Sequence, residues 1–138
     1  MFLVHDTLGL QGVALDYALA SALDWTEPFY NVGKIRYDKE DGYFMMDEPD
    51  PDEAGETTKP EHFQFYTQWK PQRNKALITL LIVKYQLAIT WHQGLATVSK
   101  GELSHTDENL GTAAARIVVT YKLGSHVTLP DYINNQGG

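Results

Sequence analysis

Residues 109–130 read NLGTAAARIVVTYKLGSHVTLP, and this stretch decides the fold. Its apolar residues recur every three or four positions, which predicts a helix over residues 109–123 with one apolar stripe. The stripe comprises Leu110, Ala114, Ile117 and Tyr121, widened by Ala113 and Val118. The alanines leave room for another element to approach closely. Gly124 can adopt positive φ and end the helix, and the alternation after it predicts a short strand that stops at Pro130.

A second apolar face predicts another helix over residues 11–24. Its large members are Leu15, Leu19 and Leu23, with Ala18 and Ala22 beside them. Leucine and alanine are also good helix formers, so pattern and propensity agree. Residues 76–86 contain a short run of leucine, isoleucine and valine, which suits either a buried strand or a buried helix.

Short β-prone runs between the helices predict a small sheet. The expected strands are residues 31–37, 62–69, 87–92 and 95–99. Residues 43–46 are apolar enough to pack or pair. Gln93-Gly94 is expected to form a hairpin turn between residues 87–92 and 95–99. Residues 100–108 are expected to be a connector, in which Ser104 and Asp107 have the spacing of a capping box.

The fold class expected from these patterns is α+β: two amphipathic helices packed on a small, mostly antiparallel sheet. The 138 residues fit a single domain spanning 1–138, with a frayed tail at residues 134–138. Residues 1–10 lack the basic start of a signal peptide. The longest strongly apolar run, residues 76–83, is far shorter than the roughly 20 residues of a membrane-spanning helix. We therefore expect a soluble protein without a membrane partner.

The acidic residues are concentrated in residues 38–61. This segment holds ten acidic and two basic residues, a net charge of −8, whereas the remaining eight acidic and nine basic residues sum to +1. Residues 47–60, DEPDPDEAGETTKP, contain no large apolar side chain and predict a long acidic loop. The lack of a basic surface disfavours direct binding to nucleic acid.

Catalytic and metal-binding signatures are missing from the sequence. The chain has no cysteine, and its five histidines form no HExxH pair. Ser104-His105 and Ser125-His126 are adjacent pairs, and adjacent residues rarely supply the geometry of a nucleophile and its base. A partial calcium-loop spacing in the acidic segment is interrupted by prolines. We expect no catalytic residues, no metal, no cofactor and no enzymatic activity.

Two stretches resemble a known family. Residues 10–23, LQGVALDYALASAL, resemble the opening signature L-x-G-x-A-L-D-W/Y-A-V-A of the phage NinX family, small proteins of unknown function from tailed phages and prophages. Residues 113–130 are similar to its ending, A-x-R-x-x-V-x-x-K-L-G-D-x-V-x-V-P. Residues 66–69 and 91–96 are similar to its Y-S-x-x-W segment and its tryptophan-rich hairpin. The resemblance implies a phage-encoded protein in the cytoplasm of the bacterial host, and a short helix near residues 81–86 leading into a strand.

The function expected is that of a phage or prophage accessory protein that binds a host protein or protein–nucleic-acid complex. One version is an inhibitor of a bacterial defence complex, of the anti-CRISPR type, acting through clustered carboxylates. The candidate binding residues are Asp47, Glu48, Asp50, Asp52, Glu53 and Glu56.

Two alternatives stay open. One is a small-ligand-binding protein or minor enzyme of phage metabolism, with an aromatic pocket. Its candidate lining residues are Tyr66, Trp69, Trp91 and Tyr121. The other is a structural phage component. The sequence also leaves a homo-oligomer open.

Overall fold

The computed structural model describes residues 2–25, 35–39, 43–46, 67–68, 71–73 and 75–133. These residues form an α+β fold, as the sequence predicts. The described part of the chain contains three α-helices rather than the two expected: α1 (Gly12–Ala22), α2 (Lys75–Tyr85) and α3 (Leu110–Leu123). The additional helix α2 covers residues 76–85 of the stretch 76–86, for which helix and strand were both open.

The described strands form three small sheets in which every pairing is antiparallel. In the first, β1 (Phe2–Asp6) pairs with β8 (His126–Pro130). The second has the order β2 (Ile35–Asp38), β3 (Tyr43–Met46) and β4 (Thr67–Gln68). The third has the order β5 (Ala88–His92), β6 (Leu95–Lys100) and β7 (Leu103–Asp107). The expected hairpin is confirmed, with positive φ at both Gln93 and Gly94.

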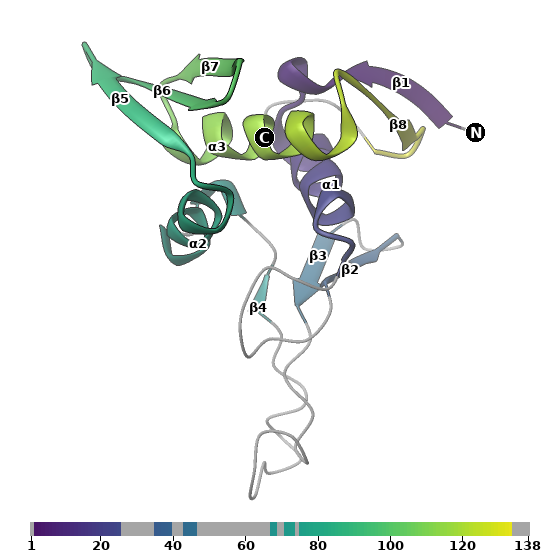
Figure 1. Ribbon diagram of the computed structural model, residues 1–138. Coiled ribbons are helices and arrows are strands. Elements are labelled where there is room, and N and C mark those ends of the chain that lie inside the picture. Colours follow the sequence, from purple (N-terminus) through teal and green to yellow (C-terminus); the bar gives the residue numbers. More distant parts are fainter. Residues whose placement is uncertain are drawn as a thin grey trace, which may run out of the picture.

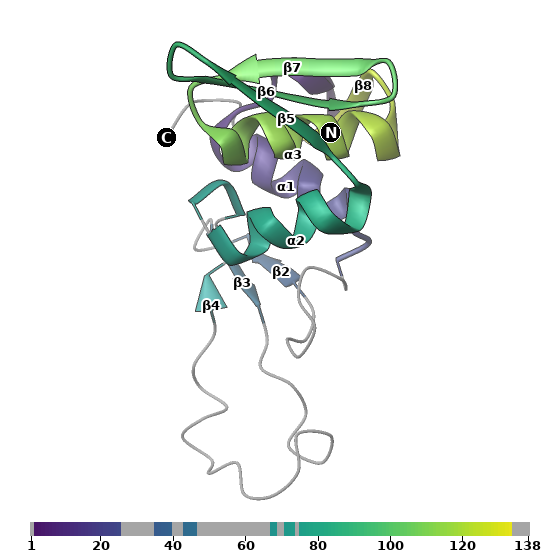
Figure 2. The same cartoon turned by 60° about the vertical axis from the view of Figure 1, so that its left-hand side comes forward.

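Helix α3 lies in the middle of this arrangement. The sheet β5–β6–β7 covers one side of it, and α1 and α2 lie on the other (Figures 1 and 2). Its buried residues are Gly111, Ala113, Ala114, Ala115, Ile117, Val118, Val119 and Thr120. The expected single stripe is therefore wrong in two respects: Tyr121 is 52% exposed, and residues outside the stripe are buried. A helix covered from several sides needs small or apolar residues around most of its surface.

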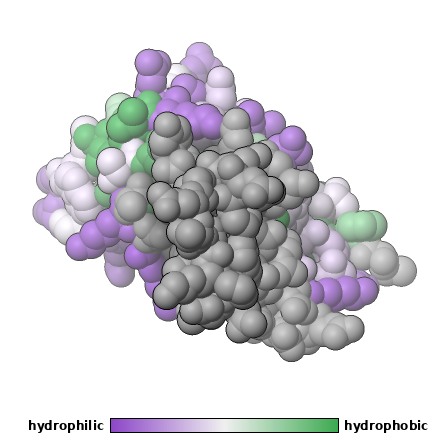
Figure 3. Space-filling view, turned by 90° about the horizontal axis from the view of Figure 1, so that it is seen from below, coloured by the Kyte–Doolittle hydropathy of each residue, from purple (hydrophilic) through white to green (hydrophobic). Residues whose placement is uncertain are grey.

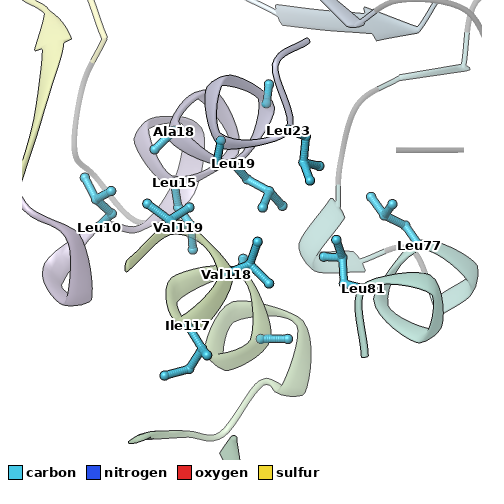
Figure 4. Close-up of a cluster of buried hydrophobic side chains, with 14 of the residues drawn as sticks. Leu10, Leu15, Ala18, Leu19, Leu23, Leu77, Leu81, Ile117, Val118 and Val119 are labelled. Atoms are coloured by element: carbon cyan, nitrogen blue, oxygen red, sulfur yellow. The ribbon is translucent and has the colours of Figure 1, made fainter. Parts of the chain in front are cut away.

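The core is formed where the three helices meet. Figure 4 shows leucines of α1 and valines of α3 converging with Leu77 and Leu81 of α2. Leu15, Leu19 and Leu77 are fully buried, as the periodicity of α1 predicts for the first two. Each fully buried leucine contributes roughly 1.5–3 kcal/mol relative to an exposed one.

Gly111 marks the closest approach to α3. A Cβ atom at this position would overlap the backbone carbonyl of Gln72, in the short 3-10 helix η3 (Pro71–Arg73). The Gln72 side chain then joins both helices: its amide nitrogen donates to Asp16 of α1 (2.8 Å), and its amide oxygen accepts from Thr112 of α3 (2.7 Å). A single amide thus links η3, α1 and α3.

The segment before α3 differs from the sequence expectation. Residues 100–108 are not a connector, because β7 occupies Leu103–Asp107 and adds a third strand to the hairpin. The capping box expected from Ser104 and Asp107 is also wrong. Asn109 is the N-cap, and its side chain accepts a hydrogen bond from the Thr112 N–H at 3.0 Å.

The two-stranded ribbon β1–β8 was only half predicted. The strand ending at Pro130 is confirmed, whereas β1 has no counterpart among the predicted strands. The ribbon is fixed to α3 by two buried threonines. Thr7 donates its hydroxyl to the Gly124 carbonyl (2.9 Å) and accepts a hydrogen bond from the Thr120 hydroxyl (2.9 Å). Gly124 has φ 94°, which ends α3 as the sequence predicts.

Candidate functional site

The predicted acidic binding residues lie outside the described residues, but the strands on either side of them are described. The acidic residues follow β3 and precede β4 in the chain. Met46, at the end of β3, is the register partner of Thr67, at the start of β4. The end of β3 and the start of β4 therefore lie side by side at the same end of one small sheet (Figure 2).

An aromatic cluster adjoins this sheet. It comprises Tyr17, Trp25, Tyr37, Phe44 and Tyr132. The Tyr17 ring of α1 makes edge contacts with the rings of Trp25 (centroids 5.0 Å apart) and Tyr37 (5.6 Å). Tyr37 and Phe44 are register partners in β2 and β3, with centroids 4.6 Å apart. Each aromatic pair of this kind stabilises the folded state by about 0.5–1.5 kcal/mol, in addition to the stabilisation from the apolar surface that it buries.

The backbone that presents Trp25 is strained. Asp24 and Trp25 have φ values of 58° and 60°, a region that L residues other than asparagine and aspartate rarely adopt. Hydrogen bonds hold them there: the Trp25 N–H donates to the Ala20 carbonyl (2.8 Å), and the Ile35 N–H donates to the Trp25 carbonyl (2.8 Å). Backbone strain of this kind is concentrated at functional sites in proteins, so this end of α1 is a candidate for one.

The exposed side of the cluster carries a tyrosine and a cation. Tyr132 is 43% exposed and stacks on Tyr37 with centroids 6.0 Å apart. The Lys39 ammonium lies 4.9 Å from the centroid of the Tyr132 ring. A hydrogen bond from the Ile133 N–H to the Pro130 carbonyl (3.0 Å) closes the turn after β8 that holds Tyr132 in place.

The Tyr17 phenol stays protonated at neutral pH. Burial, followed by the proximity of Tyr132 and a hydrogen bond to it, raises the pKa of Tyr17 above its usual value. Tyr17 is therefore not a general base near neutral pH. The cluster can offer ring faces, hydroxyl groups and one ammonium group, which suits binding rather than acid–base chemistry.

The predicted aromatic pocket is a different set of residues. Tyr66 and Trp69 lie outside the described residues, so a pocket formed with them stays a prediction. Trp91 is 60% exposed on β5, where it pairs with Ala96. Tyr121 contacts Lys100, at the other end of β6, with the ammonium 4.7 Å from the ring centroid. The structure therefore places Trp91 and Tyr121 at opposite ends of the hairpin.

A partly buried polar network involves one of the two Ser-His pairs. Arg116 of α3 donates to the Leu10 carbonyl (2.7 Å) and to Asp107 (3.0 Å), and lies 2.8 Å from His105 Nε2. Burial, and then the Arg116 charge, lower the pKa of His105, and Asp107 partly offsets this. Ser104 and His105, as successive strand residues, point to opposite faces, so they form no nucleophile–base pair. Arg116 instead ties β7 and the start of α1 to α3.

The second pair departs from the sequence argument. Ser125 Oγ and His126 Nδ1 lie 3.0 Å apart, although adjacent residues rarely supply the geometry of a nucleophile and its base. Gly124, at positive φ, bends the chain just before them. Both side chains are exposed, whereas a serine nucleophile is activated by a base that a third group holds in orientation.

No family model and no curated protein matches the chain. Among the described residues, no group of three histidine or carboxylate side chains is placed to hold a metal ion. No helix in that part of the chain is long and apolar enough to cross a membrane.

The aromatic cluster is the feature that the sequence reasoning missed. Its members come from α1, the end of α1, β2, β3 and the turn after β8, so no local spacing connects them. Only the apolar run in β3, which was expected to pack or pair, pointed to it.

Proposed function

We propose that this protein is a non-enzymatic phage or prophage accessory protein that binds a basic surface of a host macromolecular complex. The observation that carries the proposal is the charge distribution: residues 38–61 hold a net charge of −8, and the rest of the chain holds +1. Negative charge concentrated in one segment produces an electrostatic field that accelerates association with a basic partner. The same field favours one orientation of the two molecules when they meet. A complex that handles nucleic acid has such a basic surface, which makes a bacterial defence complex the favoured target.

The aromatic cluster supports this proposal by its position. Phe44 of the cluster lies in β3, two residues before the end of the strand at Met46. The predicted acidic loop, residues 47–60, follows directly in the sequence. Binding energy in protein interfaces comes mainly from tyrosine, tryptophan and arginine anchors, whereas peripheral charges act mainly on the association rate. We assign steering to the acidic residues and anchoring to the exposed Tyr132.

The phage context rests on the NinX resemblance of residues 10–23 and 113–130. The structure gives those stretches a packing role, because they contain α1, α3 and β8, which form the core and its attached ribbon. The resemblance therefore concerns the scaffold. The acidic residues lie outside the stretches that carry the resemblance, and we assign them to recognition of the proposed target.

The proposal is tested by association kinetics with a partner captured from bacterial lysate. Replacing Asp50, Asp52 and Glu53 by their amides should slow association and flatten its dependence on salt. The matched control replaces the exposed Glu102, Glu108 and Asp131 by their amides, which changes the net charge equally. If both variants associate at the same rate and with the same salt dependence, the steering role is excluded.

A second candidate function is the binding of a small molecule at the aromatic cluster. The strained Trp25 backbone and the exposed Tyr132 beside Lys39 favour it. A ligand that binds the folded state raises the melting temperature by mass action. Thermal-shift screening against nucleotides and sugars should then yield a stabilising compound whose effect is lost in Tyr132→Ala. If no compound stabilises the protein, this alternative is rejected.

A further inference from the structure

The ribbon β1–β8 exposes an apolar edge strand that the proposed function does not use. Phe2, Leu3 and Val4 of β1 are 63%, 49% and 68% exposed. Within the described part of the chain, β1 pairs only with β8, so its other edge is unpaired there. In Figure 1 the strand extends away from the helices, and Figure 3 shows a small hydrophobic patch on the same side of the molecule.

The hydrogen-bond pattern fixes which groups face the free edge. The Thr7 N–H donates to the Ser125 carbonyl (2.9 Å), and this pair continues the β1–β8 register. Hydrogen-bonded and non-hydrogen-bonded pairs alternate along an antiparallel ladder, so Leu3 and His5 bond to β8. The backbone N–H and C=O groups of Phe2, Val4 and Asp6 therefore point away from β8, toward the unpaired edge.

The outer edge of β8 is protected, and that of β1 is not. Pro130 is the register partner of Phe2 and occupies a non-hydrogen-bonded position, so its missing N–H is on the outer side of β8. Proteins block edge strands with proline, lysine or bulges, and β1 contains none of these. A partner strand can therefore pair with β1 at a complete row of donors and acceptors.

We propose that β1 pairs with β1 of a second copy across a two-fold axis at Val4. Antiparallel pairing about Val4 places Phe2 opposite Asp6 and Leu3 opposite His5, so no like charges face each other. The free groups of Phe2, Val4 and Asp6 then meet their equivalents in the second copy, and each pairing exchanges two main-chain hydrogen bonds. The result is a continuous four-stranded sheet, β8–β1–β1–β8, with Phe2 and Val4 of both copies on one face.

The buried area sets the strength of this dimer. Three partly exposed apolar side chains offer on the order of 300 Å² per copy, the size of a small exposed patch. The total surface area buried on pairing is therefore smaller than the about 1,200 Å² that a stable interface of standard size buries. The dimer is therefore weak and forms as the protein concentration rises, independently of the acidic residues.

Sedimentation velocity of the full chain, from low micromolar to near-millimolar concentration, tests the proposal. The average mass should rise toward twice the chain mass. Val4→Lys places two like charges at the two-fold axis and should weaken association at least tenfold. Thr128→Lys is the matched control: Thr128 is the exposed register partner of Val4, the charge change is the same, and association should change less than twofold.

Hydrogen exchange identifies the contact. The amides of Val4 and Asp6 should exchange more slowly as concentration rises, whereas those of Leu3 and His5, bonded to β8, should not change. A chain that stays monomeric throughout, or a dimer that Val4→Lys leaves intact, overturns the proposal. A dimer whose Val4 and Asp6 amides remain unprotected also overturns it, because the contact then lies elsewhere.

Discussion

Helix α3 and the aromatic cluster are built in opposite ways. Around α3 the backbone is regular, the side chains are small, and buried polar groups such as Thr7 and Thr120 are hydrogen-bonded. At the aromatic cluster the rings are large, Asp24 and Trp25 have strained backbones, and Tyr132 remains exposed. Stability and binding compete for the same residues in many proteins. Here the close, hydrogen-bonded packing lies around α3, whereas the strained and exposed residues lie at the aromatic cluster, to which our proposal assigns binding.

Among the substitutions that test this contrast, we expect the largest loss of stability at Gly111, in the close packing around α3. In Gly111→Ala the new Cβ meets the Gln72 carbonyl and the end of Ile78, so η3 or α2 must move. We expect a loss of about 3 kcal/mol in the free energy of unfolding, measured by urea denaturation. The control is Gly9→Ala, whose Cβ would have its nearest contact 3.9 Å away at Asp6, and which should change stability little. Equal effects of the two substitutions would show that the close approach is unimportant.

Arg116→Met should have the next largest effect. It removes the donors to the Leu10 carbonyl and to Asp107 from a site where the Arg116 side chain is 11% exposed. The loss expected is about 2–3 kcal/mol, because the carbonyl and carboxylate keep their desolvation cost without a partner. Lys122→Met, at an exposed position of the same helix, should stay within about 0.5 kcal/mol. Chemical denaturation of both variants measures the difference, and a mild effect at Arg116 would contradict the structural role of the network.

The Arg116 network also predicts a pH dependence. The pKa of His105 in the folded protein is lowered from the usual 6.5, mainly by burial and then by Arg116. Well above pH 6.5 the imidazole is neutral in both states, whereas the unfolded chain takes up the proton first as the pH falls through this value. The free energy of unfolding should therefore fall as the pH drops below this value. His105→Gln should reduce this slope, and an unchanged slope would show that other groups cause it.

Asp24→Gly should have the smallest effect and the opposite sign. Glycine adopts φ near 58° without the steric cost that aspartate meets at the end of α1. We expect a gain of about 0.5–1 kcal/mol, measured by thermal or urea unfolding. Asp24→Ala provides the comparison, because alanine keeps a Cβ and should give no gain. A glycine variant that loses stability would show that Asp24 makes a contact worth more than the strain.

The pattern of apolar residues in the sequence predicts much of the fold. The elements that it failed to predict were missed for physical reasons. Periodicity located α1 and α3 because their leucines and alanines face the core, and Gly124 ended α3 as expected. Periodicity alone did not separate helix from strand for α2, where nearly every residue is apolar. β7 was missed because its alternation is of serine, histidine and threonine, which also occur in connectors.

The candidate site was less predictable than the fold. Clustered charge is visible in a sequence, so the acidic residues were named, but they lie outside the described residues. Contacts such as Tyr37 with Tyr132 join residues far apart in the chain, and only the folded chain brings them together. The strain at Trp25 likewise depends on the Ile35 hydrogen bond from a later segment.

The most direct measurement for the assignment of binding to the acidic residues is affinity capture from bacterial lysate at low and high salt. The wild type is compared with the amide variants at Asp50, Asp52 and Glu53 and at Glu102, Glu108 and Asp131. We expect the wild type and the second variant to recover the same nucleic-acid-handling complex at low salt. The first variant should lose it, and all three should lose it at high salt. Recovery of the same proteins by all three at both salt concentrations would contradict the assignment.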